Sequence, residues 1–217
     1  MPIQRFETNV TVVGRIPAHA TTKAISGEPM LFSSSVDFAI DNGGPLTRLA
    51  IAALPMTAPP RGLHAVIDTR SHMLMPGQYP AIPGWHCDAV PRPNGQPDFA
   101  RLDVRQRHYT VTVAEDGRHM PMVEFFAPQG CPAVDLRYTP MCVWASLNET
   151  INGLDEIYIR YGEHGDVMEF SSLVPHRAQS SPGRGWRWFF RLSYMEKPPK
   201  NEIRRQVQVY TTEGLGW

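Results

Sequence analysis

Apolar and polar residues alternate along most of the chain after about Val66, and alternation is the period of a β-strand rather than of a helix. Eight short segments carry this pattern, and Gly, Pro, Asn or Asp separates most of them. They are AVIDTRSHML (65–74), RHYTVTV (107–113), MVEFF (122–126), RYTPMCVWA (137–145), DEIYIRY (155–161), DVMEFSSL (166–173), WRWFFRLSY (186–194) and RQVQVYTT (205–212). The pattern predicts a mainly β fold, a sandwich or jelly roll, with few short helices.

The first 62 residues differ from the rest because they are rich in Ala, Ser, Thr, Gly and Pro. Within them the apolar stretch 46–54 predicts a short helix, which the breaker-rich PMTAPPRG ends. We expect residues 1–62 to be an N-terminal extension packed on a main body of residues 63–217, as one domain. A chain of 217 residues buries roughly 70% of its unfolded surface without disulfides or a structural metal.

Charge and cysteine content exclude several classes of protein. The 21 Lys and Arg balance the 21 Asp and Glu, which argues against a protein that coats nucleic acid. Three cysteines without a CxxC pair suit a reducing compartment. The start MPIQRFETNV has no apolar core, and no apolar run reaches about 18 residues. We therefore expect a cytoplasmic protein with neither a signal peptide nor a membrane span.

The segment PGWHCD places two metal-binding side chains on one face of an extended chain. His86 and Asp88 are two residues apart and point the same way, while Cys87 points the opposite way. His176, at the end of the segment 166–173, supplies a third candidate ligand. Two histidines and one carboxylate leave three coordination positions open, as non-haem Fe(II) oxygenases require. A closed structural site would leave no room for oxygen and a co-substrate.

The segment WRWFFRLSY carries the fourth element of this pattern. Alternation places Arg187, Phe189, Arg191 and Ser193 on one face of a strand and its other aromatic and apolar residues on the opposite face. A guanidinium holds a carboxylate through two parallel hydrogen bonds, and a neighbouring hydroxyl adds a third donor. Arg191 with Ser193 therefore suits the far end of a dicarboxylic co-substrate.

Taken together, His86-Cys87-Asp88, His176 and Arg191-Leu192-Ser193 resemble the signature of the Fe(II)/2-oxoglutarate-dependent dioxygenase superfamily. The resemblance covers about residues 66–195 and names a superfamily, not a member. It implies a double-stranded β-helix in which the first three side chains hold Fe(II) and act in catalysis, while Arg191 and Ser193 anchor 2-oxoglutarate. It also implies oxidation of the co-substrate to succinate and CO2, coupled to hydroxylation of a substrate C–H bond.

Three features of the sequence leave alternatives open. The two histidine ligands are 90 positions apart, which implies an insertion around residues 91–103 or 127–135. Arg187 follows His176 by 11 positions and Arg191 by 15, and both spacings suit the superfamily; we prefer Arg191 because Ser193 accompanies it. A second His-x-Asp, His164-Gly165-Asp166, lies in a glycine-rich segment that predicts a hairpin turn, where alternation does not fix side-chain direction.

Other histidines and arginines have simpler interpretations. We expect His64, His72, His108 and His119 to lie outside the metal site. Arg177 faces away from His176 by alternation, and we expect it to pair with an acid such as Asp166 or Glu169.

The alternative function is a non-catalytic jelly-roll binding or structural module with a vestigial metal site. The sequence does not identify the substrate, although charge neutrality favours a small molecule or an exposed side chain over nucleic acid.

Overall fold

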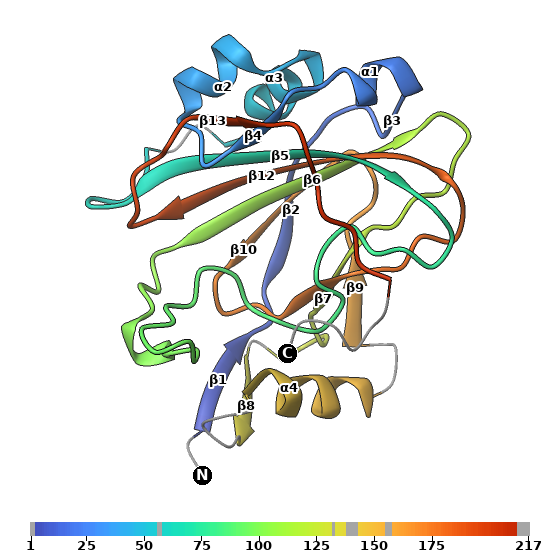
Figure 1. Ribbon diagram of the computed structural model, residues 1–217. Coiled ribbons are helices and arrows are strands. Elements are labelled where there is room, and N and C mark those ends of the chain that lie inside the picture. Colours follow the sequence, from blue (N-terminus) through green and yellow to red (C-terminus); the bar gives the residue numbers. More distant parts are fainter. Residues whose placement is uncertain (1–2, 56–57, 132, 138–142, 155–157, 212–217) are drawn as a thin grey trace.

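The computed structural model describes residues 3–55, 58–131, 133–137, 143–154 and 158–211 (Figure 1). Antiparallel strands dominate it, and its helices are short. The strands are β1 (Ile3–Glu7), β2 (Val10–Arg15), β3 (His19–Ala20), β4 (Met30–Phe32), β5 (His64–Leu74), β6 (Arg107–Glu115), β7 (Val123–Phe126), β8 (Ala133–Arg137), β9 (Ile159–Tyr161), β10 (Asp166–Ser171), β11 (His176–Ala178), β12 (Gly185–Met195) and β13 (Glu202–Arg204). The α-helices are α1 (Thr22–Ser26), α2 (Val36–Asn42), α3 (Pro45–Ala52) and α4 (Val143–Asn152), with a 3-10 turn, η1, at Phe99–Arg101.

A six-stranded sheet forms the centre of the molecule. Its strands follow the order β2-β10-β6-β12-β5, and β3 lies parallel to β6 at one end. A separate three-stranded sheet has the order β11-β7-β9, and β1–β8 and β13–β4 are two-stranded pairs. The long pairing of β12 with both β5 and β6 fixes the register of the central sheet. The fold is therefore mainly β, whereas a double-stranded β-helix stays a prediction.

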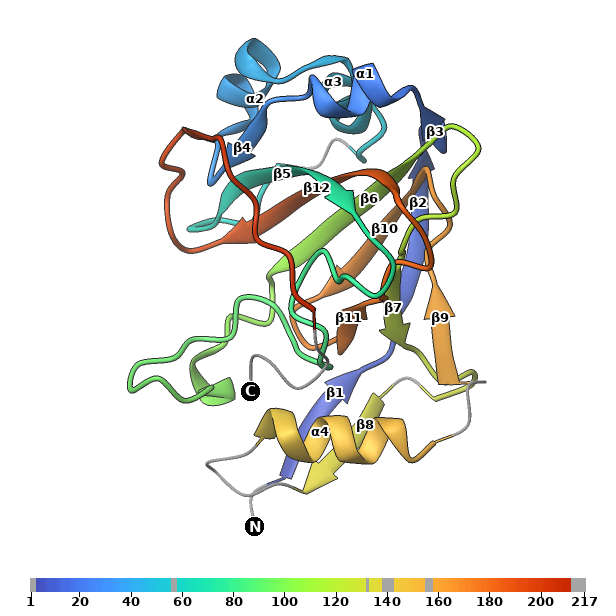
Figure 2. The same ribbon diagram turned by 45° about the vertical axis from the view of Figure 1, so that its right-hand side comes forward.

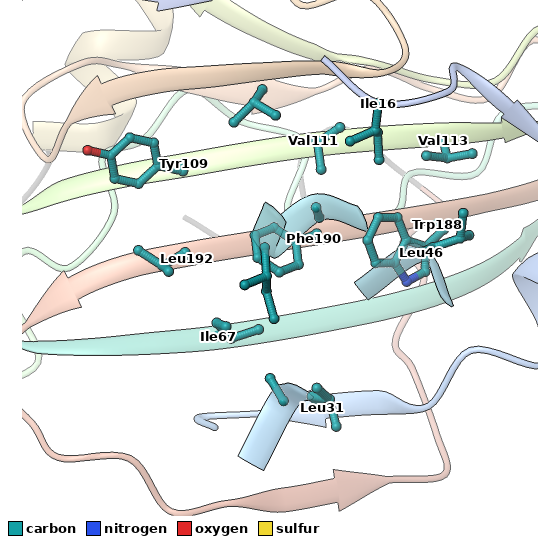
Figure 3. Packing of buried hydrophobic residues seen from close by; sticks show 14 of the residues in the cluster. Ile16, Leu31, Leu46, Ile67, Tyr109, Val111, Val113, Trp188, Phe190 and Leu192 are labelled. Carbon is teal, nitrogen blue, oxygen red and sulfur yellow. The ribbon is translucent and has the colours of Figure 1, made fainter. Parts of the chain in front are cut away.

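Helices α1, α2 and α3 cover one face of the central sheet (Figure 1). The side chains of β12 that point to this face are Trp188, Phe190 and Leu192, which pack among apolar residues of the helices and neighbouring strands (Figure 3). Burial of such large side chains stabilises the fold by about 1.5–3 kcal/mol each. The opposite face of β12 carries Arg187, Phe189 and Arg191, which line a cavity. The expected alternation along this strand is confirmed.

Glu28 fixes the start of α3 against the sheet. Its carboxylate is buried and accepts hydrogen bonds from the N–H groups of Gly44 (3.2 Å) and Leu46 (2.6 Å) and from the hydroxyl of Thr47 (2.8 Å). These are donors at the first turn of α3, where a negative charge is favourable. The short helix expected over 46–54 is confirmed as α3.

Several expected strands are confirmed, and two are wrong over their described residues. The segments 65–74, 107–113, 122–126, 166–173 and 186–194 correspond to β5, β6, β7, β10 and β12. In the segment 137–145, Arg137 ends β8 and residues 143–145 are helical because α4 begins at Val143, while residues 138–142 lie outside the described part. Residues 205–211 form no strand; among them Tyr210 makes an isolated bridge to Tyr79. Residues 155–157 are also outside the described part, and β9 follows them.

The N-terminal 62 residues contribute to several layers. Strand β2 is an edge strand of the central sheet beside β10, β1 pairs with β8, and α1–α3 form the covering layer. The division at residue 62 stays a prediction. In the part of the chain that the structure describes, none of the helices has both the length and the apolar character that crossing a membrane requires.

Candidate metal centre

Backbone pairing brings the two candidate histidine ligands together. His86 and His176 are direct partners in an isolated antiparallel bridge, with N–H to O distances of 3.1 and 2.9 Å. Residues directly opposite each other in such a bridge project their side chains to the same side. The two rings are accordingly close, with centroids 4.8 Å apart. Although 90 positions separate these histidines in the sequence, the fold makes them neighbours.

Asp88 completes the cluster from a turn rather than from a strand. The bridge at His86 is one residue long, and Asp88 lies in the turn that follows, next to Ala89 with a φ of 59°. One ligand atom from each of His86, Asp88 and His176 lies within 4.8 Å of the others. Asp88 Oδ2 is 3.4 Å from His176 Nε2. The side-chain convergence that alternation predicted is present, although the local structure is a bridge and a turn.

Backbone carbonyls orient both imidazole rings. Nδ1 of His86 is 2.7 Å from the carbonyl oxygen of Gly84, and Nδ1 of His176 is 3.0 Å from that of Val174. A carbonyl oxygen only accepts, so Nδ1 of each ring donates in these contacts and Nε2 is left as the ligand atom. Metal-binding histidines show this arrangement, in which the second ring nitrogen donates to a carbonyl or carboxylate. The orientation of both rings therefore suits metal binding through Nε2.

Charge within the cluster also suits a cation. Burial, reinforced by neighbouring His176, lowers the pKa of His86 to about 4, so this ring is neutral at neutral pH. Burial raises the pKa of Asp88, but the positive charge of Arg191 and the interactions with His176 together outweigh burial and hold that pKa well below its usual range. Neutral imidazole and ionised carboxylate are the states that bind metal. Two nitrogens and one carboxylate fit a ferrous ion with open positions.

Arg191 is in contact with two carboxylates. Its guanidinium donates to Asp88 Oδ2 at 2.6 Å and to Asp68 Oδ2 at 2.9 Å. Burial lowers the pKa of Arg191, but the charges of Asp88 and Asp68 outweigh this and raise it above its ordinary value. Arg191 thus holds the candidate metal ligand Asp88 in place. The sequence placed Arg191 near the site, but it contained no sign of the pairing with Asp68.

Ser193 makes its contact with a histidine. The ring nitrogens of His108 share hydrogen bonds of 2.8 Å with the hydroxyls of Ser193 and Ser172, and Ser172 donates to Gln106 at 3.0 Å. All four residues are buried. This network lies beside the cluster and occupies the hydroxyl that was expected to assist a carboxylate anchor. The anchoring role of Arg191 and Ser193 is a prediction that the geometry leaves untested.

The buried His108 gives a testable dependence of stability on pH. Burial lowers the pKa of His108 to about 3, whereas an unfolded histidine titrates near 6.5. Between these values the unfolded chain binds a proton that the folded chain does not, so stability falls as pH decreases from about 6.5 toward 3. We expect this histidine to change the free energy of unfolding by up to about 1.4 kcal/mol per pH unit.

Urea unfolding with chelator present, from pH 7 to 4.5, measures this dependence. The free energy of unfolding should vary less with pH for His108→Gln than for wild type. His119→Gln, at an exposed position, is the control, and parallel profiles for all three proteins would contradict the assignment.

Arg187 lies in the same cavity without an acidic partner. It is 2% exposed, and its Nε donates to the carbonyl of Pro121 at 2.7 Å. Among the described residues no ion pair joins Arg187 to a carboxylate. Burial and the positive charge of Arg70 lower its pKa to about 9, so it stays charged at neutral pH. The cavity that Arg187 lines also includes His86, Asp88 and His176.

Asn148 holds the backbone next to His86, a role that no sequence pattern indicated. Its amide oxygen accepts from the N–H of Trp85 at 2.7 Å, and its amide nitrogen donates to the Trp85 carbonyl at 3.0 Å. Asn152, one turn further along α4, accepts from the indole N–H of Trp85 at 3.0 Å, and Arg177 stacks over that indole. Helix α4 therefore positions the residue before the first ligand.

Loss of this clamp should weaken metal binding. We expect Asn148→Ala to reduce Fe(II) affinity by about tenfold, the lower end of the effect seen when outer partners of metal ligands are removed. The measurement is anaerobic titration with Fe(II). Glu149→Ala, at the exposed neighbouring position, is the matched control. Equal affinities for both variants would show that α4 does not position His86.

The second His-x-Asp serves the packing of the loop between β9 and β10. His164 shares hydrogen bonds with the Thr112 hydroxyl (2.9 Å) and the Met120 carbonyl (3.0 Å), and Asp166 pairs with Arg15. The segment does turn, with Gly165 at a φ of 85°. It is not a hairpin as expected, because β9 pairs with β7 while β10 pairs with β2 and β6.

One further expectation is wrong. Arg177 pairs with Glu124, and not with Asp166 or Glu169, because β11 lies against β7 and brings these side chains together. His72 lies outside the metal cluster, as expected, although it lines the cavity beside the cluster. Its pKa falls to about 3 because it is buried, so it adds no charge.

Comparisons with known proteins give only distant likenesses. No protein-family model and no curated protein matches the chain. A non-heme monooxygenase, solved as the ThoJ–Ni complex, is similar with a TM-score of 0.34 and 12% identity over 61% of this chain. The match spans 44% of the ThoJ chain, less than half its length. EctD from S. alaskensis in its apoform is similar with a TM-score of 0.40 and 14% identity, over 92% of this chain and 88% of that one. The roles of the side chains therefore depend on their own geometry.

Proposed function

We propose that this chain is an Fe(II)- and 2-oxoglutarate-dependent oxygenase that hydroxylates a C–H bond and releases succinate and CO2. The observation that carries the proposal is the cluster of His86, Asp88 and His176, whose ligand atoms lie within 4.8 Å of one another beside a cavity. Three protein ligands leave positions for oxygen and a chelating co-substrate. When bound, ferrous iron supplies the redox chemistry that activates oxygen.

The chain's own residues prepare this site before any ligand arrives. The carbonyls of Gly84 and Val174 accept from Nδ1 of the two histidines, which leaves Nε2 of each ring as the ligand atom. Arg191 orients Asp88 through the hydrogen bond to Oδ2 and helps to keep it ionised. Neither His86, whose pKa is lowered to about 4, nor Asp88, whose pKa is held well below its usual range, has to lose a proton at neutral pH to bind a cation. The folded chain therefore holds the ligand side chains in position before a metal binds.

Arg187 is the anchor that we propose for the distal carboxylate of 2-oxoglutarate, in place of the Arg191 and Ser193 pair preferred from the sequence. Arg191 already donates to Asp68 and Asp88, whereas Arg187 has no carboxylate partner among the described residues. A buried guanidinium is costly unless a negative charge pairs with it. A dicarboxylate that chelates the metal with its near end supplies that charge.

Apolar walls would keep water from the reacting centre. The cavity is lined by Phe170 and Phe189 from the central sheet and by Val123 and Ala178 from the three-stranded sheet. Exclusion of water protects a reactive oxidant and strengthens the electrostatic contacts inside the site. We propose that the substrate is a small molecule or an exposed side chain.

Anaerobic spectroscopy tests the proposal directly. Addition of Fe(II) and 2-oxoglutarate should produce a visible charge-transfer absorption band that neither compound gives with the protein alone. Oxygen should then convert 2-oxoglutarate to succinate in amounts equal to the bound iron or greater. Absence of the band in wild-type protein would contradict the proposal.

Metal analysis separates this function from a non-catalytic module. Protein purified from cells without chelator should contain about one transition-metal ion per chain, and 2-oxoglutarate should raise its melting temperature only when Fe(II) or Mn(II) is present. A module with a vestigial site would carry no stoichiometric metal and would not respond to 2-oxoglutarate.

A further inference from the structure

A second arginine in the cavity lacks an acidic partner. Arg70 projects from β5 into the same space as Arg187 and is half-buried. In the described part of the chain it forms no ion pair. Burial and the charge of Arg191 lower the pKa of Arg70, and the nearby charges of Asp68 and Asp88 offset this only in part. Its side chain is therefore a cation whose environment favours the arrival of an anion.

A count of side-chain charges leaves one of the two unpaired arginines without a partner even when the co-substrate is bound. Arg177 lines this cavity and Arg204 lines a second one next to it, but each has an acid of its own, Glu124 and Glu202. Arg70, Arg187 and Arg191 face two carboxylates, Asp68 and Asp88, and both carboxylates contact Arg191. The side chains thus leave a surplus of one positive charge. A divalent ion adds two charges and 2-oxoglutarate removes two, so the surplus stays. One further negative charge would balance the site.

The register of the central sheet separates the two arginines. Arg187 is opposite His72, whereas Arg70 is opposite Phe189, two residues further along β12. The two arginines are diagonal neighbours on adjacent strands, with backbones roughly 7–8 Å apart. Arg187 lines the cavity beside the metal cluster, which we call the inner cavity. Arg70 lines that cavity and also the second one next to it, which we call the outer opening. Because Arg187 is buried and Arg70 is half-buried, an anion at Arg70 would lie nearer to solvent than one at Arg187.

The outer opening has the composition of a small-molecule site. It shares Arg70, His86, Asp88 and Arg191 with the inner cavity, and its volume is about 310 Å3. Apolar and amide side chains line much of the rest, namely Met30, Leu31, Phe32, Gln206, Val207 and Gln208. The C-terminal segment that supplies three of them crosses in front of β5 and β12 (Figure 2). Arg204 also lines the outer opening, with its guanidinium over the Phe32 ring and within ion-pair distance of Glu202. Pockets of this size and mixed character bind small ligands.

We propose that Arg70 binds the carboxylate of a small monocarboxylic acid, which is the substrate whose C–H bond is oxidised. This inference rests on the proposed oxygenase function and narrows its substrate class. The carboxylate pairs with Arg70 beside the metal ligands, and the apolar or amide-bearing remainder of the acid occupies the outer opening. Two hydrogen bonds from the guanidinium would fix the orientation of the acid.

Matched acids and amides test this inference without a known substrate. Wild-type protein is loaded anaerobically with Fe(II) and 2-oxoglutarate and then titrated with hexanoate or hexanamide, and with N-acetylglycine or N-acetylglycinamide, at constant ionic strength. The readouts are the shift of the charge-transfer band and the melting temperature. At least one acid should bind about tenfold or more tightly than its amide, as expected for a charge-assisted contact.

The variants assign that preference to one side chain. Arg70→Gln should remove the preference for the acid and leave the affinity for 2-oxoglutarate within about twofold, whereas Arg70→Lys should keep part of the preference. Arg184→Gln removes the same charge at an exposed position and should behave as wild type. Equal binding of acids and amides by wild type, including no binding of either, would overturn the inference. Loss of 2-oxoglutarate binding in Arg70→Gln would overturn it as well, because Arg70 would then serve the co-substrate. If the oxygenase proposal itself is wrong, the charge-transfer band is already absent before any acid is added. That result is distinct from a failure of the inference on Arg70.

Discussion

Replacing His86 by alanine is expected to abolish stoichiometric Fe(II) binding and turnover of 2-oxoglutarate, while the same change at His164 leaves both intact. The two histidines begin the two His-x-Asp sequences of this chain, so they are matched in local sequence. Only His86 lies with Asp88 and His176, and its ring carries the proton on Nδ1. The affinity for Fe(II) should fall by more than about 100-fold, because even loss of an outer partner costs 10–100-fold.

The measurement is anaerobic Fe(II) titration followed by the charge-transfer band with 2-oxoglutarate. His164→Ala removes the contacts with Thr112 and Met120, so its melting temperature should decrease, and the titration is done where circular dichroism shows a folded protein. Retention of metal by His86→Ala would exclude the cluster as the iron site. Loss of metal in both folded variants would show that the comparison reports general damage.

Local alternation predicted the parts of the site that depend on one strand. In WRWFFRLSY the pattern placed Arg187, Phe189 and Arg191 on the cavity face, and the long pairing of β12 with two neighbours enforces it. The same reasoning worked for His86 and Asp88, although they lie in a bridge and a turn. Their ligand atoms do converge, although the described backbone is a one-residue bridge at His86 followed by a turn at Asp88.

Contacts between segments that are distant in the sequence cannot be predicted from local patterns of apolar and polar residues. Arg191 reaches Asp68 across 123 positions, and Asn148 reaches Trp85 across 63. The sequence contained one unused signal for α4, since Trp144, Leu147 and Ile151 recur at helical spacing and are buried. The alternation in 137–145 predicted a strand instead, and for residues 143–145 that prediction is wrong.

The segment 205–212 shows why alternation alone does not make a strand. Its pattern is regular, but residues 205–211 are largely exposed, and among them Tyr210 forms an isolated bridge to Tyr79. A strand needs a neighbour whose backbone groups pair with its own. The nearby β13 pairs with β4 through residues that precede this segment. Pairing partners, unlike periodicity, are set by the whole fold.

Replacing Arg187 by glutamine is expected to weaken 2-oxoglutarate binding by about 100-fold, near the upper end for loss of a hydrogen-bonded charge pair. The physical reason is that Arg187 is buried, charged and without a carboxylate partner among the described residues, so the distal carboxylate of the co-substrate is its natural counter-ion. Fe(II) affinity should change little, because Arg187 contacts none of the three ligands through a hydrogen bond or ion pair that involves the described residues.

Arg191→Gln should give the opposite pattern. It leaves Asp68 and Asp88 without their shared guanidinium, so stability and Fe(II) affinity should both decrease, because Asp88 loses the partner that keeps it ionised. Titration of the charge-transfer band with 2-oxoglutarate at saturating Fe(II) separates the two variants, and Arg187→Lys should recover part of the lost affinity. If Arg191→Gln loses the co-substrate at saturating metal while Arg187→Gln keeps it, the anchor is the Arg191 and Ser193 pair that the sequence favoured.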